Sequence, residues 1–181
     1  EFIARLGYRI AEAQPNGKWK PILDGEAARY HFEFPGSTHA FRTDWDNKEH
    51  HVTSFVENTT EESYSGERSL KAVFDRTSGG CGYRVYVQTY YRPEDFNDSR
   101  YDPSFSPNLY PGQTISMKVK LPESERRTIQ GRLYVRDRNG DKYHYSGKMT
   151  IQPGKWMEMR YRIPAMANVC LLEAGVELIP E

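Results

Sequence analysis

The sequence has few cysteines and no long hydrophobic run. Two cysteines in 181 residues, Cys81 and Cys170, are too few for a scaffold built from disulfides. They either pair across a sandwich or stay as buried thiols, and the sequence leaves both alternatives open. No run approaches the ~18 consecutive apolar residues of a membrane-spanning helix, so we expect no membrane partner.

An excess of charge of one sign is also lacking. Lys and Arg total 25, and Asp and Glu total 25, so the formal net charge is zero. A protein that binds polyanions in general carries a basic excess, so we expect no nucleic-acid partner. Aromatic residues make up 13% of the chain, and this content argues against disorder.

The sequence shows no pattern of a long amphipathic helix. Apolar and polar residues instead alternate with a period of two in most segments. Frequent Gly and Pro turns separate the alternating segments, and Asn139-Gly140 is the strongest hairpin signal. Together these patterns predict an all-β fold, an antiparallel sandwich or jelly roll of about nine to ten strands. The expected strands are 6–12, 27–34, 50–56, 67–75, 81–91, 113–121, 129–137, 142–151, 155–163 and 168–179.

The regular alternation lies mostly after residue 45. We therefore expect residues 1–45 to be an N-terminal arm and linker that packs on the sandwich or bridges to a parent domain. Residues 46–181 are expected to form the sandwich domain. The chain begins at Glu1-Phe2 without an initiator Met, and we expect a domain cut from a larger protein. The Pro-rich segment 92–112 is expected to be an ordered crossover.

Two expected strands place Tyr beside Arg or Gln on the face opposite their apolar residues. Sugars present apolar C–H faces rimmed by hydroxyls, so they suit aromatic rings flanked by hydrogen-bonding groups. We expect both sets of side chains to emerge, uncovered, on one shared platform. The candidate carbohydrate-binding residues are Arg84, Tyr86, Gln88, Tyr90, Arg132, Tyr134 and Arg136. Tyr and Arg are also common on ordinary sheet surfaces and at protein interfaces, so a structural or interaction domain stays open as an alternative.

Three short motifs then carry a resemblance. Residues 65–72 (SGERSLKA), 111–119 (PGQTISMKV) and 153–156 (PGKW) occur in the order and spacing seen in one family. In this respect the chain resembles carbohydrate-binding modules with the galactose-binding-like jelly-roll fold. More loosely, the stretch from Thr89 to Gln113 resembles tails that follow ADP-ribosylglycohydrolase-type catalytic domains.

The resemblance implies a non-catalytic accessory domain that holds a glycoside hydrolase or related enzyme near an oligosaccharide or polysaccharide. A parent catalytic domain would then be a partner, and the protein would be extracellular or at the cell surface. Such domains often bind a structural calcium ion. By resemblance, its ligands would be Glu57, Gly66, Arg68 and Glu177, with the second and third acting through backbone carbonyls.

Catalytic and zinc-binding motifs are lacking. The five histidines show no HxH, HExxH or Cys/His spacing, and no GxSxG, P-loop or GxGxxG motif occurs. We therefore predict no catalytic residues. A hydrolase would require two convergent carboxylates in a groove, which the sequence alone does not locate.

Overall fold

The chain folds into strands and loops in a computed structural model that describes residues 11–13, 19–21, 32–47, 49, 51–89, 109, 111–137, 142–166 and 171–181. The described part contains twelve strands and no helix, and hence no helix that could cross a membrane. The strands are β1 (Ala11–Ala13), β2 (Trp19–Pro21), β3 (Arg42–Trp45), β4 (Ser54–Thr59), β5 (Ser69–Phe74), β6 (Tyr83–Gln88), β7 (Thr114–Val119), β8 (Ile129–Asp137), β9 (Tyr143–Tyr145), β10 (Met149–Ile151), β11 (Met157–Arg162) and β12 (Leu171–Pro180).

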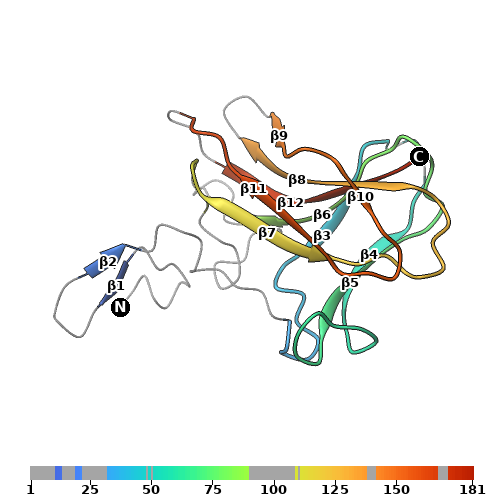
Figure 1. The fold of residues 1–181 in the computed structure, drawn as a ribbon, viewed down its shortest axis with the longest axis horizontal. Coiled ribbons are helices and arrows are strands. Elements are labelled where there is room, and N and C mark those ends of the chain that lie inside the picture. Colours follow the sequence, from blue (N-terminus) through green and yellow to red (C-terminus); the bar gives the residue numbers. More distant parts are fainter. Residues whose placement is uncertain are drawn as a thin grey trace.

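The strands β3 to β12 form the layers of an antiparallel sandwich (Figure 1). One layer is a six-stranded sheet with the order β10-β8-β12-β6-β3, in which β9 also pairs with β8. The other layer consists of the pairs β7–β11 and β4–β5. The strands β1 and β2 pair with each other. The predicted all-β antiparallel sandwich is confirmed.

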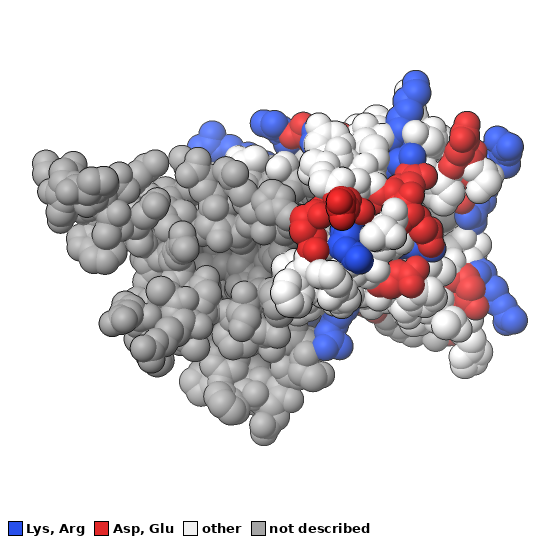
Figure 2. Space-filling model, turned by 90° about the horizontal axis from the view of Figure 1, so that it is seen from below, with Lys and Arg blue, Asp and Glu red and all other residues white. Residues whose placement is uncertain are grey.

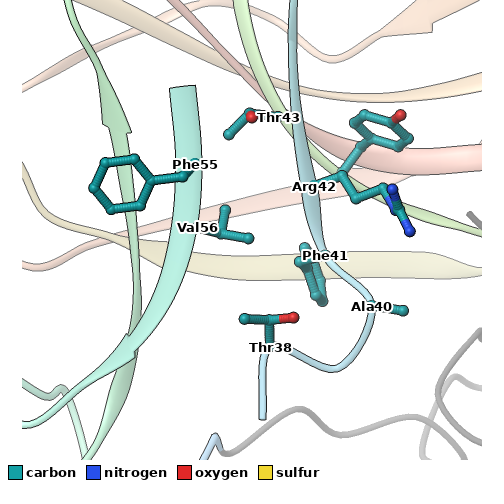
Figure 3. A pocket seen from close by; sticks show the side chains of 8 residues that line it. Thr38, Ala40, Phe41, Arg42, Thr43, Phe55 and Val56 are labelled. Atoms are coloured by element: carbon teal, nitrogen blue, oxygen red, sulfur yellow. The ribbon is translucent and has the colours of Figure 1, made fainter. Parts of the chain in front are cut away.

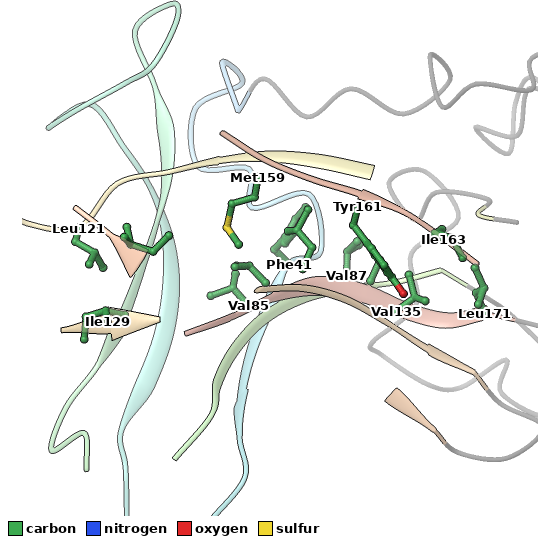
Figure 4. Close-up of a cluster of buried hydrophobic side chains, with 14 residues drawn as sticks. Phe41, Val85, Val87, Leu121, Ile129, Val135, Met159, Tyr161, Ile163 and Leu171 are labelled. Atoms are coloured by element: carbon green, nitrogen blue, oxygen red, sulfur yellow. The ribbon is translucent and has the colours of Figure 1, made fainter. Parts of the chain in front are cut away.

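The hydrophobic core lies between these layers (Figure 4). The six-stranded sheet contributes alternate side chains such as Val85, Leu133 and Val176, and β11 contributes Met159 and Tyr161 from the other side. The alternation explains the faces, because successive side chains of a strand point to opposite sides of its sheet. Odd-numbered residues of β6 and β8 therefore fill the core, and even-numbered residues face away from it.

The boundaries of several strands differ from the sequence prediction. Residues 42–45, expected to belong to an arm, form the edge strand β3, and Phe41 lies in the core. The strand expected at 50–56 is displaced to β4, and the one expected at 142–151 divides into β9 and β10. The strand expected at 27–34 is wrong for its described part, since residues 32–34 form no strand. Residues 6–10, residues 27–31, Asn139-Gly140 and all but residues 109, 111 and 112 of the segment 92–112 lie outside the described residues.

Candidate functional site

The face of the six-stranded sheet that points away from the core is polar and aromatic. Its centre is the strand β12, which pairs with β6 on one side and β8 on the other. The register aligns three rows of residues across β6, β12 and β8. The rows are Gln88–Glu173–Arg136, Tyr86–Gly175–Tyr134 and Arg84–Glu177–Arg132. We call this surface the polar face.

Glu177 connects two arginines of the polar face. Its side chain is completely buried. One carboxylate oxygen accepts hydrogen bonds from the Arg84 Nε at 2.9 Å and the Tyr145 hydroxyl at 3.4 Å. The other accepts one from the Arg132 Nε at 2.5 Å. Two cations thus compensate one buried carboxylate, which a buried charge requires.

Arg84 is the most extensively paired cation of this group. It also donates to the Asp46 carboxylate. Burial by itself disfavours the charged guanidinium, but the negative charges of Asp46 and Glu177 outweigh this effect and raise the Arg84 pKa above its ordinary value. The arginine therefore stays charged at every pH at which the protein is folded.

Three tyrosines lie together at the β8–β9 side of the polar face. The rings of Tyr143 and Tyr145 are nearly parallel, with an interplanar angle of 13° and centroids 5.9 Å apart. The ring of Tyr134 lies 5.5 Å from that of Tyr143, and its hydroxyl donates to Glu173 at 3.2 Å. Burial, followed by the charge of Glu173, raises the Tyr134 pKa well above its usual value. The phenol therefore remains a hydrogen-bond donor.

Guanidinium groups lie against the rings of this tyrosine cluster. The guanidinium carbon of Arg132 lies 3.4 Å from the Tyr145 ring centroid, and that of Arg84 lies 4.4 Å from the Tyr143 centroid. Arg136 donates to the Tyr143 hydroxyl at 3.3 Å. These contacts are cation–π and hydrogen-bond interactions that fix the side chains relative to the sheet.

The structure brings the predicted carbohydrate-binding residues together on one face but does not leave them uncovered. Among the predicted residues that the structure describes, Arg84, Tyr86, Gln88 and Tyr134 are buried, so the expectation of an open platform is wrong for these four. The physical reason is that β12 supplies carboxylates that pair with the arginines, while β9 places two more rings beside Tyr134. The side chains of Arg132 and Arg136 retain 22% and 20% exposure. Tyr90 lies outside the described residues.

Sequence reasoning missed four side chains of this network: Asp46, Tyr143, Tyr145 and Glu173. The even spacing of Arg132, Tyr134 and Arg136 was visible, and the predicted hairpin already placed the strand 142–151 beside 129–137, but Tyr143 and Tyr145 of that strand were not assigned to the site. The alternation in residues 143–145 was a usable signal, because a strand that follows a hairpin pairs with its predecessor. The pairing of β12 between β6 and β8 joins residues distant in sequence, and no local pattern reports it.

A hollow of about 420 Å³ lies at the edge of the sandwich between β3 and β4 (Figure 3). Val56 and Phe41 point into the gap between these strands, whereas the ring of Phe55 lies on the far side of β4. Of the predicted carbohydrate-binding residues that the structure describes, Tyr86 alone lines this hollow. The hollow is lined both by Phe41 and Val56, which pack in the core, and by Tyr86 of the polar face.

The predicted calcium ligands do not converge. Glu177 lies on the polar face between two arginines, whereas β4 and β5 pack on the core side of the sheet through Val56 and Leu70. Glu57 forms an ion pair with Lys71 at 3.2 Å. A cation would meet the repulsion of Arg84 and Arg132 at Glu177, so this residue does not fit the predicted set. Within the described ranges, no group of three or more His, Cys, Asp or Glu residues is arranged to hold a metal ion.

The loop that contains the other two predicted ligands is held by Glu33. The Glu33 carboxylate accepts hydrogen bonds from the backbone amides of Glu67 and Arg68 at 3.1 and 3.3 Å. Gly66 lies against the same carboxylate. Calcium binding at Glu57, Gly66 and Arg68 stays a prediction. Cys81 is a buried free thiol, and Cys170 lies outside the described residues.

Comparison with known proteins supports the fold. No protein-family model and no curated protein sequence matches the chain. Among solved structures, the chain is similar to one from a study of promiscuous specificity in carbohydrate-binding modules of the β-sandwich superfamily, with a TM-score of 0.58 and 17% identity. The match covers 94% of this chain, which spans 64% of that structure's length.

A second similar structure is the C-terminal family 22 carbohydrate-binding module of Clostridium thermocellum Xyn10B. It has a TM-score of 0.51 and 21% identity, and the match covers 87% of each chain. The fold implied by the three sequence motifs is thus confirmed: this chain has the β-sandwich architecture of carbohydrate-binding modules.

Proposed function

We propose that the chain is a non-catalytic carbohydrate-binding domain that recognises a glycan on the polar face. The observation that carries this proposal is the register of β6, β12 and β8, which gathers tyrosines and arginines from separate strands on one sheet surface. A glycan requires aromatic surface and hydrogen-bonding groups in fixed positions, and this face supplies both. The similarity of the fold to carbohydrate-binding modules supports the same function.

The half-buried side chains of the face make the direct contacts in this proposal. Arg132, Arg136, Tyr143 and Tyr145 combine partial exposure with fixed geometry, so little side-chain entropy is lost when a sugar binds. The buried Arg84, Tyr86, Gln88 and Tyr134 form the second layer that holds them. A sugar that touches only the exposed parts of these side chains recovers little desolvation energy, and affinities in the micromolar to millimolar range follow.

The arrangement of charges favours binding over hydrolysis. Glycoside hydrolysis uses one protonated carboxylic acid and one free carboxylate on either side of the scissile bond. The two carboxylates of β12, Glu173 and Glu177, are both paired with arginines. We infer that the domain is non-catalytic and acts beside a parent catalytic domain, which it holds near an extracellular or cell-surface polysaccharide.

Affinity electrophoresis in gels that contain neutral soluble polysaccharides tests the proposal. Tyr143→Ala is expected to weaken binding about tenfold, because a stacked aromatic contact contributes about 0.5–1.5 kcal/mol and about 1.4 kcal/mol corresponds to a factor of ten. Phe34→Ala, which removes an exposed ring from the chain segment preceding β3, is the matched control. Wild-type protein that is retained by none of the polysaccharides would contradict the proposal.

A second candidate function is that of a structural or protein-interaction domain without a sugar site. The complete internal pairing of Glu177, Arg84 and Arg132 favours it, because a ligand must then bind without new ion pairs. Tyr and Arg are also enriched in protein interfaces. If none of the polysaccharides retains the wild-type protein, and the domain dimerises or binds its parent enzyme through Tyr143, this second function is the correct one.

A further inference from the structure

A pair of partly exposed aromatic rings lies on the opposite side of the sandwich. Tyr64 belongs to the connection between β4 and β5, and Trp156 directly precedes β11. Their ring centroids are 6.0 Å apart in an edge-to-face arrangement with an interplanar angle of 70°. Tyr64 is 55% exposed, which makes it one of the most exposed large aromatic side chains among the described residues.

The register of β7 and β11 places this pair outside the second layer. Met157 pairs with Val119 and faces the core, so its neighbours Glu158 and Lys118 point outward. The Lys118 ammonium lies 4.5 Å from the centroid of the Tyr64 ring. The aromatic pair is therefore fixed over the outer surface of β7 and β11, and the core separates it from the polar face.

The charges around the pair are already matched. Glu158 contacts Lys118 at 2.6 Å and Arg160 at 2.5 Å, while Lys120 forms an ion pair with Glu62. The connection that carries Tyr64 also contains Glu61 and Glu67, and acidic side chains gather on the face seen in Figure 2. Because Lys118, Lys120 and Arg160 are already paired with carboxylates, a polyanion would gain little from these cations, and a neutral ligand fits the surface better.

Neutral glycans match the remaining chemistry. Sugar C–H faces pack on aromatic rings, and hydroxyls both donate and accept, so they can use ammonium groups and carboxylates of the same rim. On the polar face, Tyr143 and Tyr145 are half-buried beside guanidinium groups, whereas Tyr64 keeps more than half of its surface exposed although Lys118 lies against its ring.

We propose that Tyr64 and Trp156 form a second contact surface for a neutral polysaccharide chain, independent of the polar face. This inference rests on the proposed carbohydrate-binding function and extends it. Two surfaces on opposite sides of one rigid domain would let a single molecule bind two polysaccharide chains. Binding to long or crowded chains would then exceed what either surface provides alone.

Affinity electrophoresis with neutral soluble polysaccharides separates the two surfaces. The proteins compared are wild type, Tyr64→Ala, Tyr143→Ala, the double variant and the control Phe34→Ala, all shown to be folded by circular dichroism. We expect each single variant to lose about tenfold in apparent affinity and the double variant to lose all retention, because the surfaces act independently. Wild-type protein should also cross-link the polysaccharide and raise its viscosity, and Tyr64→Ala should not.

The outcomes distinguish the two proposals. If wild type binds, Tyr143→Ala weakens binding, and Tyr64→Ala behaves as Phe34→Ala does, the second surface is refuted and the polar face stands. If Tyr143→Ala alone removes all binding, the second surface is refuted as well. If wild type binds no polysaccharide, the proposed function fails and this inference fails with it. If Tyr64→Ala binds the polysaccharide more weakly than wild type and no longer raises its viscosity, the second surface is supported.

Discussion

Glu177 combines complete burial with a negative charge. Its carboxylate would be costly to bury alone, and the guanidinium groups of Arg84 and Arg132 supply the compensation from the two neighbouring strands. Glu177 also positions a neighbour, since its hydrogen bond to Arg132 holds that side chain against the Tyr145 ring. The order of the polar face therefore depends on one completely buried side chain.

Removing this carboxylate tests its role. Glu177→Gln leaves two cations with an incompletely matched partner, and we expect the free energy of unfolding to fall by about 3–5 kcal/mol. Urea denaturation followed by circular dichroism measures the change. Glu158→Gln, which removes a carboxylate from the outer surface, is the control and should leave the transition midpoint unchanged. A loss no larger than that of the control would show that Glu177 does not hold the network.

The strands show how far local sequence patterns predict this fold. Period-two alternation located β5, β7, β8 and β11 to within two residues at each end and β6 to within three, and the apolar side chains of these strands do face the core. It missed β3, because Arg42 and Asp44 make an edge strand with a polar outer side resemble a loop. Alternation gives each strand its two faces but says nothing of which strands become neighbours.

The candidate site was predictable for the same reason and to the same extent. The Tyr and Arg positions of β6 and β8 follow from alternation, and they do lie on one face. Their burial was not predictable, because it depends on the insertion of β12 between β6 and β8. Gly175 illustrates the point: a Cβ there would lie 2.8 Å from the Tyr86 Cα, so the close approach of β12 and β6 requires glycine. Nothing local to Gly175 reveals that neighbour.

The connection between β7 and β8 contains a pH-sensitive contact. Hydrogen bonds from the Arg127 side chain and backbone lower the Glu125 pKa from its ordinary value of 4.5 to about 2. Arg127 in turn donates to Thr77, so the contact joins two connections that are distant in sequence. Because the folded pKa lies below the unfolded one, the stabilisation is fully present above pH 4.5 and is lost as the pH falls toward 2.

Glu125→Gln should therefore destabilise the domain at neutral pH and lose this effect in acid. The difference between wild type and variant is expected to shrink steadily between pH 4.5 and 2, the interval set by the two pKa values. Thermal unfolding at a series of pH values, followed by circular dichroism, measures it. Glu123→Gln, on the same connection, controls for the removal of a carboxylate. A wild-type-to-variant difference that stays constant across this interval would refute the assignment.

At the scale of the whole molecule, the two layers have outer faces of different chemistry. On the six-stranded sheet, the buried charges of Arg84 and Glu177 pair with each other, and Arg84 also reaches the exposed Asp46 carboxylate. On β7 and β11, charges such as Glu158 and Arg160 lie exposed and paired at the surface. The formal net charge of zero conceals this division. Two opposed outer faces of one sandwich are what the proposal of two separate polysaccharide-binding surfaces requires.

The N-terminal boundary of the sandwich domain is a property of the whole molecule, because it depends on which segments pack into the shared core. An arm ending at residue 45 would contribute little to stability, whereas the structure places Phe41 in the core with 6% exposure and its ring 5.8 Å from that of Phe32.

Phe41→Ala would leave a cavity between the layers, and we expect it to lower the free energy of unfolding by about 3–5 kcal/mol. Phe34→Ala, seven residues earlier and 75% exposed, should have no measurable effect. Urea denaturation of both variants decides the matter. Equal stability of the two would place residue 41 outside the cooperative unit, whereas a large loss for Phe41→Ala alone would make the segment before β3 part of the sandwich domain.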